Sequence, residues 1–184
     1  LLGWQSIFLL PLRLLVVSFH ELGHALAALL TGGNVIEIVI SANETGHTLT
    51  SGGWAFLILN GGYLGSLLTG ILLLALGRKE GRGVWVLRGL GLLMALVALI
   101  WVPLFSFGFL YTAFFGLALT IAARFLPTWA SDWLSRSIGL FSVFYVLPDI
   151  WGDAIWGSLF GGLIGGVSDA SLLAAATGIP AIFW

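Results

Sequence analysis

The chain has 184 residues and a formal net charge of −1, and 59% of its residues are hydrophobic while only 8% are charged. A soluble domain carries roughly 25% charged residues, so this chain has too few polar side chains to cover a water-soluble globule. It also lacks the basic stripe that a nucleic-acid binder needs. The composition therefore excludes a soluble enzyme and a nucleic-acid partner, and it favours an all-α polytopic membrane protein in contact with membrane lipid.

Apolar stretches long enough to cross a bilayer, about 20 residues each, recur between glycine, proline and charged positions. They predict five to six transmembrane helices in a single membrane-embedded domain over residues 1–184. The chain begins without Met and ends in an apolar run, which indicates a truncated C-terminus. The predicted spans cover residues 4–31, 54–76, 84–102 and 104–123, and a fifth apolar segment begins at Ser137 after a polar connection over 124–136.

A β-hairpin is predicted directly after the first span. Residues 34–41 are rich in β-branched side chains, residues 42–46 are turn-prone, and residues 47–51 form a second extended run before Gly52 and Gly53. Two such runs around a turn are typical of antiparallel strands. The sequence therefore predicts a hairpin over residues 34–51.

Basic residues mark the loops after the second and fourth spans: Arg78, Lys79 and Arg82 in one, Arg124 and Arg136 in the other. Two spans separate these loops, so both fall on the same side of the membrane. By the positive-inside rule that side is cytoplasmic, which puts the N-terminus inside and the hairpin outside. We expect a multi-pass protein of a bacterial inner membrane or an organelle membrane.

The first span contains an H-E-x-x-H motif, His20-Glu21-Leu22-Gly23-His24. Histidines at i and i+4 share one helix face, so two imidazole nitrogens can reach one zinc ion at about 2.0–2.1 Å. Glu21 can then take a proton from an activated water. Ionisable side chains inside a span are costly and usually functional. Two alternatives stay open: polar residues facing lipid headgroups, and a zinc site without catalysis.

A third ligand is needed, because catalytic zinc usually has three protein ligands. The chain has no cysteine, which leaves His47, a glutamate or a late aspartate. Counting the helical rise from the basic side puts His20 and Asp153 ~24 Å deep and Asp149 ~18 Å deep. These groups therefore share one level of the membrane, whereas Asp169 is expected further out unless the glycine-rich stretch before it re-enters the membrane.

Each of these candidates also has an ordinary structural explanation. Asp149 and Asp153 follow a proline near a predicted helix end, where carboxylates often serve as caps. Asp169 follows Ser168 at the start of an Ala/Leu-rich helix, which is typical of an N-terminal cap. His47 lies on the hairpin and is expected to be exposed.

Asn60-Gly61-Gly62 interrupts the second span. By the same rise, Asn60 lies ~20 Å from the basic side, level with the motif. Its amide is a candidate donor to a substrate carbonyl or an oxyanion, and the two glycines would let another backbone approach closely. The alternative is helix packing around a buried amide. The series Gly157, Gly161 and Gly165 is typical of close helix contact.

The sequence F-H-E-L-G-H-A-L-A-A-L-L-T-G-G, the hairpin, N-G-G-Y-L-G-S and the late S-D-A-S-L-L-A-A-A-T-G-I-P together resemble the site-2 protease class of intramembrane zinc metallopeptidases, in its compact B-like branch. The resemblance implies that His20 and His24 hold zinc with a later aspartate, that Glu21 activates water, and that a strand within 34–51 presents an extended substrate. It also implies zinc nearer the cytosol, opposite to the loop charges. The family's Leu-Asp-Gly motif is absent. Its best match is Leu147-Pro148-Asp149, with Asp153 and Asp169 as rivals.

The sequence therefore predicts zinc-dependent proteolysis of a membrane-anchored peptide substrate, with Glu21 and Asn60 as catalytic residues and His20, His24 and Asp149 as Zn²⁺ ligands. The first alternative is a non-catalytic, protease-like subunit that packs against neighbouring membrane subunits. A transporter using the His/Asp cluster is a weaker alternative.

Overall fold

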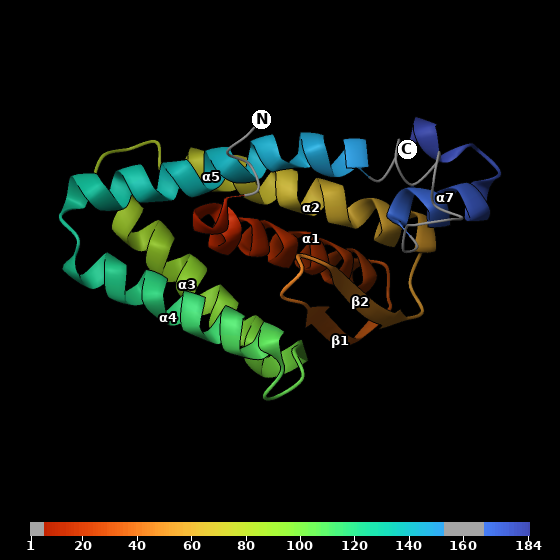
Figure 1. Ribbon diagram of the computed structural model, residues 1–184, viewed down its shortest axis with the longest axis horizontal. Coiled ribbons are helices and arrows are strands. Elements are labelled where there is room, and N and C mark those ends of the chain that lie inside the picture. Colours follow the sequence, from red (N-terminus) through yellow and green to blue (C-terminus); the bar gives the residue numbers. More distant parts are fainter. Residues whose placement is uncertain (1–5, 153–167) are drawn as a thin grey trace.

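The computed structural model describes residues 6–152 and 168–184, and it confirms a helical protein with one β-hairpin after the first long helix (Figure 1). The predictions for Asp153 and for the glycines at 157, 161 and 165 lie outside the described residues. The described elements, in chain order, are the 3-10 helix η1 (Ile7–Leu9), α1 (Leu10–Leu30), β1 (Asn34–Ile40), β2 (Gly46–Ser51), α2 (Ala55–Leu76), α3 (Gly83–Trp101), α4 (Phe107–Phe125), α5 (Thr128–Trp151), α7 (Asp169–Thr177) and the 3-10 helix η3 (Ala181–Phe183).

Four stretches of the described chain are long and apolar enough to cross a membrane: Ile7–Leu30, Ala55–Leu76, Gly83–Trp101 and Phe107–Phe125. Their bounds lie close to the first four predicted spans. The outer faces of these helices carry large, exposed apolar side chains; Leu99 and Phe114, for example, are 69% and 72% exposed. A continuous apolar surface of this kind is unfavourable in water. The protein is therefore a membrane protein whose outer surface suits lipid.

The fifth long helix begins earlier than the sequence suggests. A polar connection is predicted over residues 124–136, but α5 starts at Thr128, directly after Pro127, and runs for 24 residues through Pro148. The first turns of α5 are polar because they bind the loop between α2 and α3. A count of apolar residues along the sequence does not reveal this contact.

This binding fixes the loop between α2 and α3. The Asp132 carboxylate accepts hydrogen bonds from the backbone N–H groups of Gly81 and Gly83 at 2.8 and 2.7 Å, and Arg136 Nε donates to Gly77 O at 2.9 Å. The two backbone N–H groups hold the pKa of Asp132 below its usual range. The end of α2, the start of α3 and the start of α5 are thus joined at one end of the bundle.

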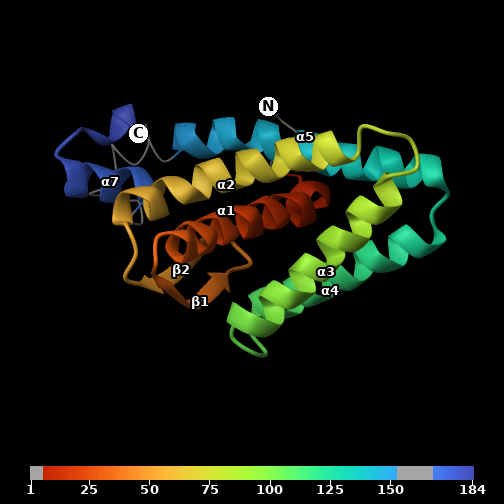
Figure 2. The same cartoon turned by 180° about the vertical axis from the view of Figure 1, so that it is seen from behind.

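The helices form two groups that meet at an angle (Figure 1, Figure 2). Helices α1, α2 and α5 run side by side, while α3 and α4 pack along each other and diverge from them. The hairpin lies at the open end between these groups and contacts α1, α3 and α4. Buried Ile38 and Ile40 of β1 anchor it there, packed with apolar residues of α1.

The hairpin confirms the predicted bounds. Strands β1 and β2 are antiparallel, with Asn34 opposite Ser51 at one end and Ile40 opposite Gly46 at the other. The register shifts between Val35 and Glu37, as in a β-bulge. Each strand pairs with only the other in this two-stranded sheet, so within the described chain its outer edge is not paired with a further strand.

Helices α1 and α2 pack at backbone distance. A Cβ atom on Gly23 would overlap Gly61 O, and one on Gly61 would lie 2.8 Å from Gly23 O. In lipid, helix association depends on such close packing of small residues rather than on the hydrophobic effect. The predicted role of the two glycines in admitting another backbone is confirmed for Gly61, whereas Gly62 meets the side chain of His20.

Candidate metal centre

The two histidines of the motif lie together on α1, one turn apart. The ring centroids of His20 and His24 are 4.7 Å apart, with the ring planes nearly perpendicular. Both rings face away from the outer surface, with side-chain exposures of 14% and 9%. The i, i+4 spacing therefore places both imidazoles on one buried face, as predicted.

Asp169 meets both imidazoles through a single oxygen. Its Oδ2 lies 2.9 Å from His20 Nε2 and 3.1 Å from His24 Nε2. The expectation that Asp169 lies further out is wrong, because Asp169 contacts both histidines of the motif. Instead α7 packs against α2 (Figure 1), and this brings its first residue to the histidines.

The start of α7 determines how Asp169 is presented. Ser168 is the N-cap, as predicted, and its hydroxyl accepts a hydrogen bond from the N–H of Ser171 at 3.3 Å. Buried Ala170 and Leu173 hold the helix in place. Burial alone would raise the pKa of Asp169, but hydrogen bonds from the two imidazoles hold it below its usual range. Asp169 is therefore presented as a carboxylate.

This donor set fits a zinc ion. The candidate ligand atoms of His20, His24 and Asp169 lie within 4.8 Å of one another. Ligands bound at about 2.0–2.1 Å to a tetrahedral ion are roughly 3.3 Å apart, so shifts of a few tenths of an ångström would convert the observed contacts into a coordination shell. Two neutral imidazoles and a carboxylate are ordinary zinc ligands, and this number leaves a fourth position for water.

Asp149 reaches the same histidine from the other side. Its Oδ2 lies 3.3 Å from His20 Nδ1, whereas His20 Nε2 faces Asp169. The two ring nitrogens point in different directions, so an ion on Nε2 would be out of reach of Asp149 unless the ring turned over. The predicted depths of Asp149 and His20 in the membrane therefore agree with the contact between the two side chains.

His24 is oriented by a backbone carbonyl. Its Nδ1 lies 2.7 Å from Ile58 O in the first turn of α2. A carbonyl can only accept a hydrogen bond, so Nδ1 carries the proton. When the proton on Nε2 is lost, the ring keeps its proton on Nδ1 and offers the lone pair of Nε2, which is the tautomer that binds metal.

Glu21 lies beneath the second strand of the hairpin and is only 4% exposed. The hydroxyl of Thr48 lies 2.8 Å from Glu21 Oε2 and 3.0 Å from Glu21 O. A Cβ atom on Gly46 would lie 2.5 Å from Glu21 Oε1, so a side chain at this position would displace the Glu21 carboxylate. Strand β2 thus determines where the carboxylate of the motif lies.

The turn of the hairpin is fixed to the same helix. Arg13 Nη2 lies 2.8 Å from Glu44 Oε1, and the arginine side chain is only 6% exposed. Glu44 has a φ of 67°, a left-handed conformation that non-glycine residues rarely adopt. The hairpin is therefore attached to α1 at its turn and again at Thr48.

A cavity of about 670 Å³ opens between the motif and β2. Its walls include the three motif side chains, both aspartates and residues of β2: His20, Glu21, His24, Gly46, Thr48, Asp149 and Asp169. His47 also lines it but is exposed, as expected, and takes no part in the His/Asp cluster. The cavity has room for a peptide segment next to the ligand atoms.

Asn60 and Gly62 behave differently, although they are close in sequence. The Asn60 amide donates to Phe56 O of its own helix at 2.8 Å. A Cβ atom on Gly62, in contrast, would overlap His20 Nε2. Gly62 therefore makes room for the histidine, and the catalytic role of Asn60 stays a prediction.

Sequence reasoning missed Thr48, the contact of Gly62 with His20, the Ile58 carbonyl and the placement of Asp169. The alternation of β2 puts Thr48 on the same side as Gly46 and Thr50, a weak signal that it faces the helix. A backbone carbonyl carries no signal in the sequence, and the placement of Asp169 depends on tertiary structure.

The family model described as Peptidase M50B-like matches residues 1–184. Comparisons with curated proteins and with solved structures give no match.

Proposed function

Since this chain belongs to the Peptidase M50B-like family, the site-2 protease type of membrane metallopeptidase, we propose that it cleaves membrane-anchored polypeptides with a zinc ion held by His20, His24 and Asp169. The observation that supports these ligands is the single Asp169 oxygen lying 2.9 and 3.1 Å from the two Nε2 atoms. When bound, zinc acts as a Lewis acid that lowers the pKa of a coordinated water to about 7.

Glu21 is the general base in this proposal. Its carboxylate borders the same cavity as the three ligands, so it can take a proton from the attacking water and return it to the leaving amine. Thr48 holds the carboxylate through the bond to Oε2. Because the Thr48 hydroxyl donates to Oε2, the other carboxylate oxygen of Glu21, Oε1, keeps its lone pairs to accept the proton of the water.

Asp149 and Ile58 orient the two imidazoles. Asp149 accepts the Nδ1 proton of His20, and the carbonyl of Ile58 accepts that of His24. Such partners fix the tautomer and ring orientation of a metal-bound histidine and raise its basicity. In this arrangement the two aspartates have different roles: Asp169 binds the ion, and Asp149 orients the ligand His20.

The substrate enters as an extended segment. A transmembrane helix has all its backbone groups hydrogen-bonded and must unwind locally before cleavage, and in lipid those groups need new partners. The free edge of the hairpin supplies them by adding the substrate as a further strand. The contacts of β2 with Glu21 support a position for such a strand beside the base.

The test is cleavage of a membrane-anchored reporter by purified protein in vesicles, compared with E21Q and with E80Q as the matched control. Glu80 lies exposed in the α2–α3 loop, away from the cavity. We expect E21Q to keep its zinc and lose cleavage, and E80Q to behave like the wild type. Unchanged cleavage by E21Q would contradict the proposal, and a wild type that binds no zinc would favour the non-catalytic subunit.

A further inference from the structure

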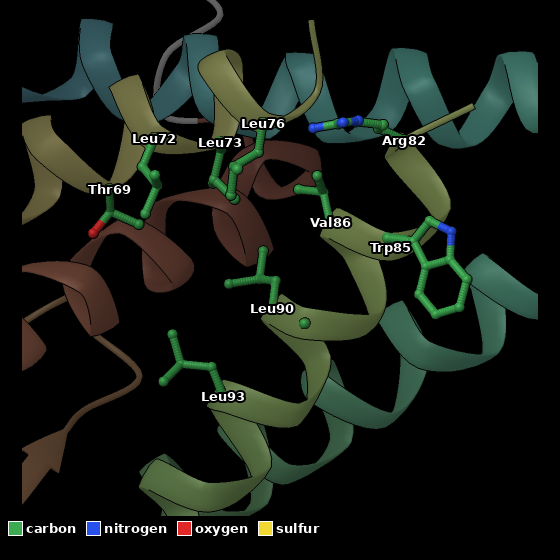
Figure 3. A pocket seen from close by; sticks show the side chains of 10 residues that line it. Thr69, Leu72, Leu73, Leu76, Arg82, Trp85, Val86, Leu90 and Leu93 are labelled. Carbon is green, nitrogen blue, oxygen red and sulfur yellow. The ribbon is translucent and has the colours of Figure 1, made fainter. Parts of the chain in front are cut away.

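A second cavity, of about 460 Å³, lies between α2 and α3, which contact each other little beyond their connecting loop. We refer to it as the α2–α3 groove. Leu72 and Leu76 of α2 face Leu93 of α3 across it (Figure 3). All three are more than a third exposed, at 55%, 44% and 38%, so the groove opens to the surroundings of the bundle. Its walls are almost entirely hydrocarbon, which suits an acyl chain.

One end of the groove is charged. Arg82 extends from the start of α3 toward Leu76, across this end (Figure 3). Among the described residues, its guanidinium has no ion pair or side-chain hydrogen bond. Arg78 and Lys79 in the same loop are also exposed, while Glu80 is the loop's single acidic residue. A guanidinium beside an apolar groove is placed to bind a phosphate in two parallel hydrogen bonds.

The charged end of the groove lies where lipid headgroups are expected. Helix α2 ends at Leu76 and α3 begins at Gly83, so Arg82 lies where two candidate spans leave the membrane. Trp85 is 70% exposed on the first turn of α3, and Arg88 lies 5.1 Å from its ring centroid. Exposed tryptophans with nearby cations are typical of the membrane interface, and clustered basic residues there attract anionic lipids.

We propose that the α2–α3 groove binds one anionic glycerophospholipid, with an acyl chain between the leucines and the phosphate on Arg82. A transmembrane helix of a partner would fill the apolar part but would leave the guanidinium unmatched, so the charge favours a lipid. The site is distinct from the metal centre, because Leu76 lies roughly 20 Å along α2 from Gly62 at the helical rise. The proposal is independent of the proteolytic function.

Two variants separate the headgroup from the chain. R82Q removes the phosphate partner and leaves the walls intact. G89L fills the groove from α3, where a Cβ atom at residue 89 meets nothing within 4 Å; leucine also favours a helix over glycine, so we expect this variant to fold. R124Q is the matched control, because Arg124 is a basic residue at the end of another span, 5.6 Å from the Phe125 ring.

The experiment is native mass spectrometry of the full chain released from detergent with phosphatidylglycerol or phosphatidylcholine of identical acyl chains. We expect the wild type and R124Q to retain one phosphatidylglycerol in preference to phosphatidylcholine. R82Q should lower that retention about tenfold and should lower phosphatidylcholine retention less, because the choline ammonium already balances the charge of that phosphate, and G89L should remove both. Circular dichroism confirms folding of each variant. Retention in R82Q and G89L equal to that in R124Q, no headgroup preference in the wild type, or a co-purified polypeptide in the groove would each overturn the proposal.

Discussion

Helix α2 meets α1 and α3 in opposite ways, and two glycines mark the difference. At Gly62 a methyl group would overlap His20 Nε2, whereas a methyl group at Gly89, across the α2–α3 groove, would have nothing within 4 Å. The first contact positions polar side chains and has no spare room. The second is loose, apolar and open. A membrane protein of this size can thus pack its polar centre tightly while a neighbouring interface stays open.

The contrast between G62A and G89A tests the two contacts of α2 directly. Overpacking costs about 1–3 kcal/mol, and the methyl at residue 62 acts directly on His20. We expect zinc affinity to fall about 100-fold in G62A and to stay unchanged in G89A, as measured by competition with a chelator. Equal affinities in the two variants would mean that the α1–α2 contact has the same freedom as the groove.

Replacing Asp149 with Asn tests whether it holds a ligand or binds the ion. Loss of a carboxylate behind a metal-bound histidine typically costs 10–100-fold in metal affinity, so we expect D149N to retain zinc with about 30-fold lower affinity. Replacing Asp169 with Asn should abolish measurable binding. The reverse order of the two variants would make Asp149 the ligand, as the sequence suggests.

Thr48 gives a smaller effect and a different readout. A hydrogen bond to a charged group contributes about 1.5–3 kcal/mol, of which T48V should lose enough to lower kcat about tenfold. KM and zinc content should stay constant, because Thr48 positions the base and contacts none of the three ligands.

Two further variants make the Thr48 test specific. T48S keeps the hydroxyl and should restore kcat. T50V is the matched control, since Thr50 lies two residues along the same strand face and makes no hydrogen bond to Glu21 in the described chain. A T48V variant as fast as the wild type would show that the hydrogen bond does not position Glu21.

The smallest expected effect is that of N60A. The amide of Asn60 is already bonded to Phe56 O, so we expect cleavage to fall less than about threefold, because a neutral hydrogen bond within one helix contributes about 1 kcal/mol or less. The measurement is kcat/KM with the reporter. A loss of 100-fold would restore Asn60 as a catalytic donor.

Features that depend on local pattern were predictable from the sequence. The i, i+4 histidines, the hairpin over 34–51 and the Ser168 cap all follow from spacing, turn chemistry or capping within a few residues. The Gly61-Gly62 pair predicted close packing because glycine lets two helices approach closely, and Gly61 makes that backbone contact with Gly23.

Features that depend on long-range geometry were not predictable. Asp169 reaches His20 across 149 residues of chain, and a depth count along straight spans places it at the wrong level. The start of α5 was missed because Asp132 binds backbone N–H groups of a loop about 50 positions earlier. The α2–α3 groove arises from the angle between two groups of helices, which apolar spacing alone does not encode.

Zinc analysis combined with X-ray absorption tests the central claim most directly. We predict one zinc per wild-type chain, bound by two imidazole nitrogens and one carboxylate oxygen, with zinc lost in D169A and retained in D149A. Full zinc occupancy in D169A, or a wild-type spectrum without histidine ligands, would contradict the assignment of His20, His24 and Asp169 as the metal centre.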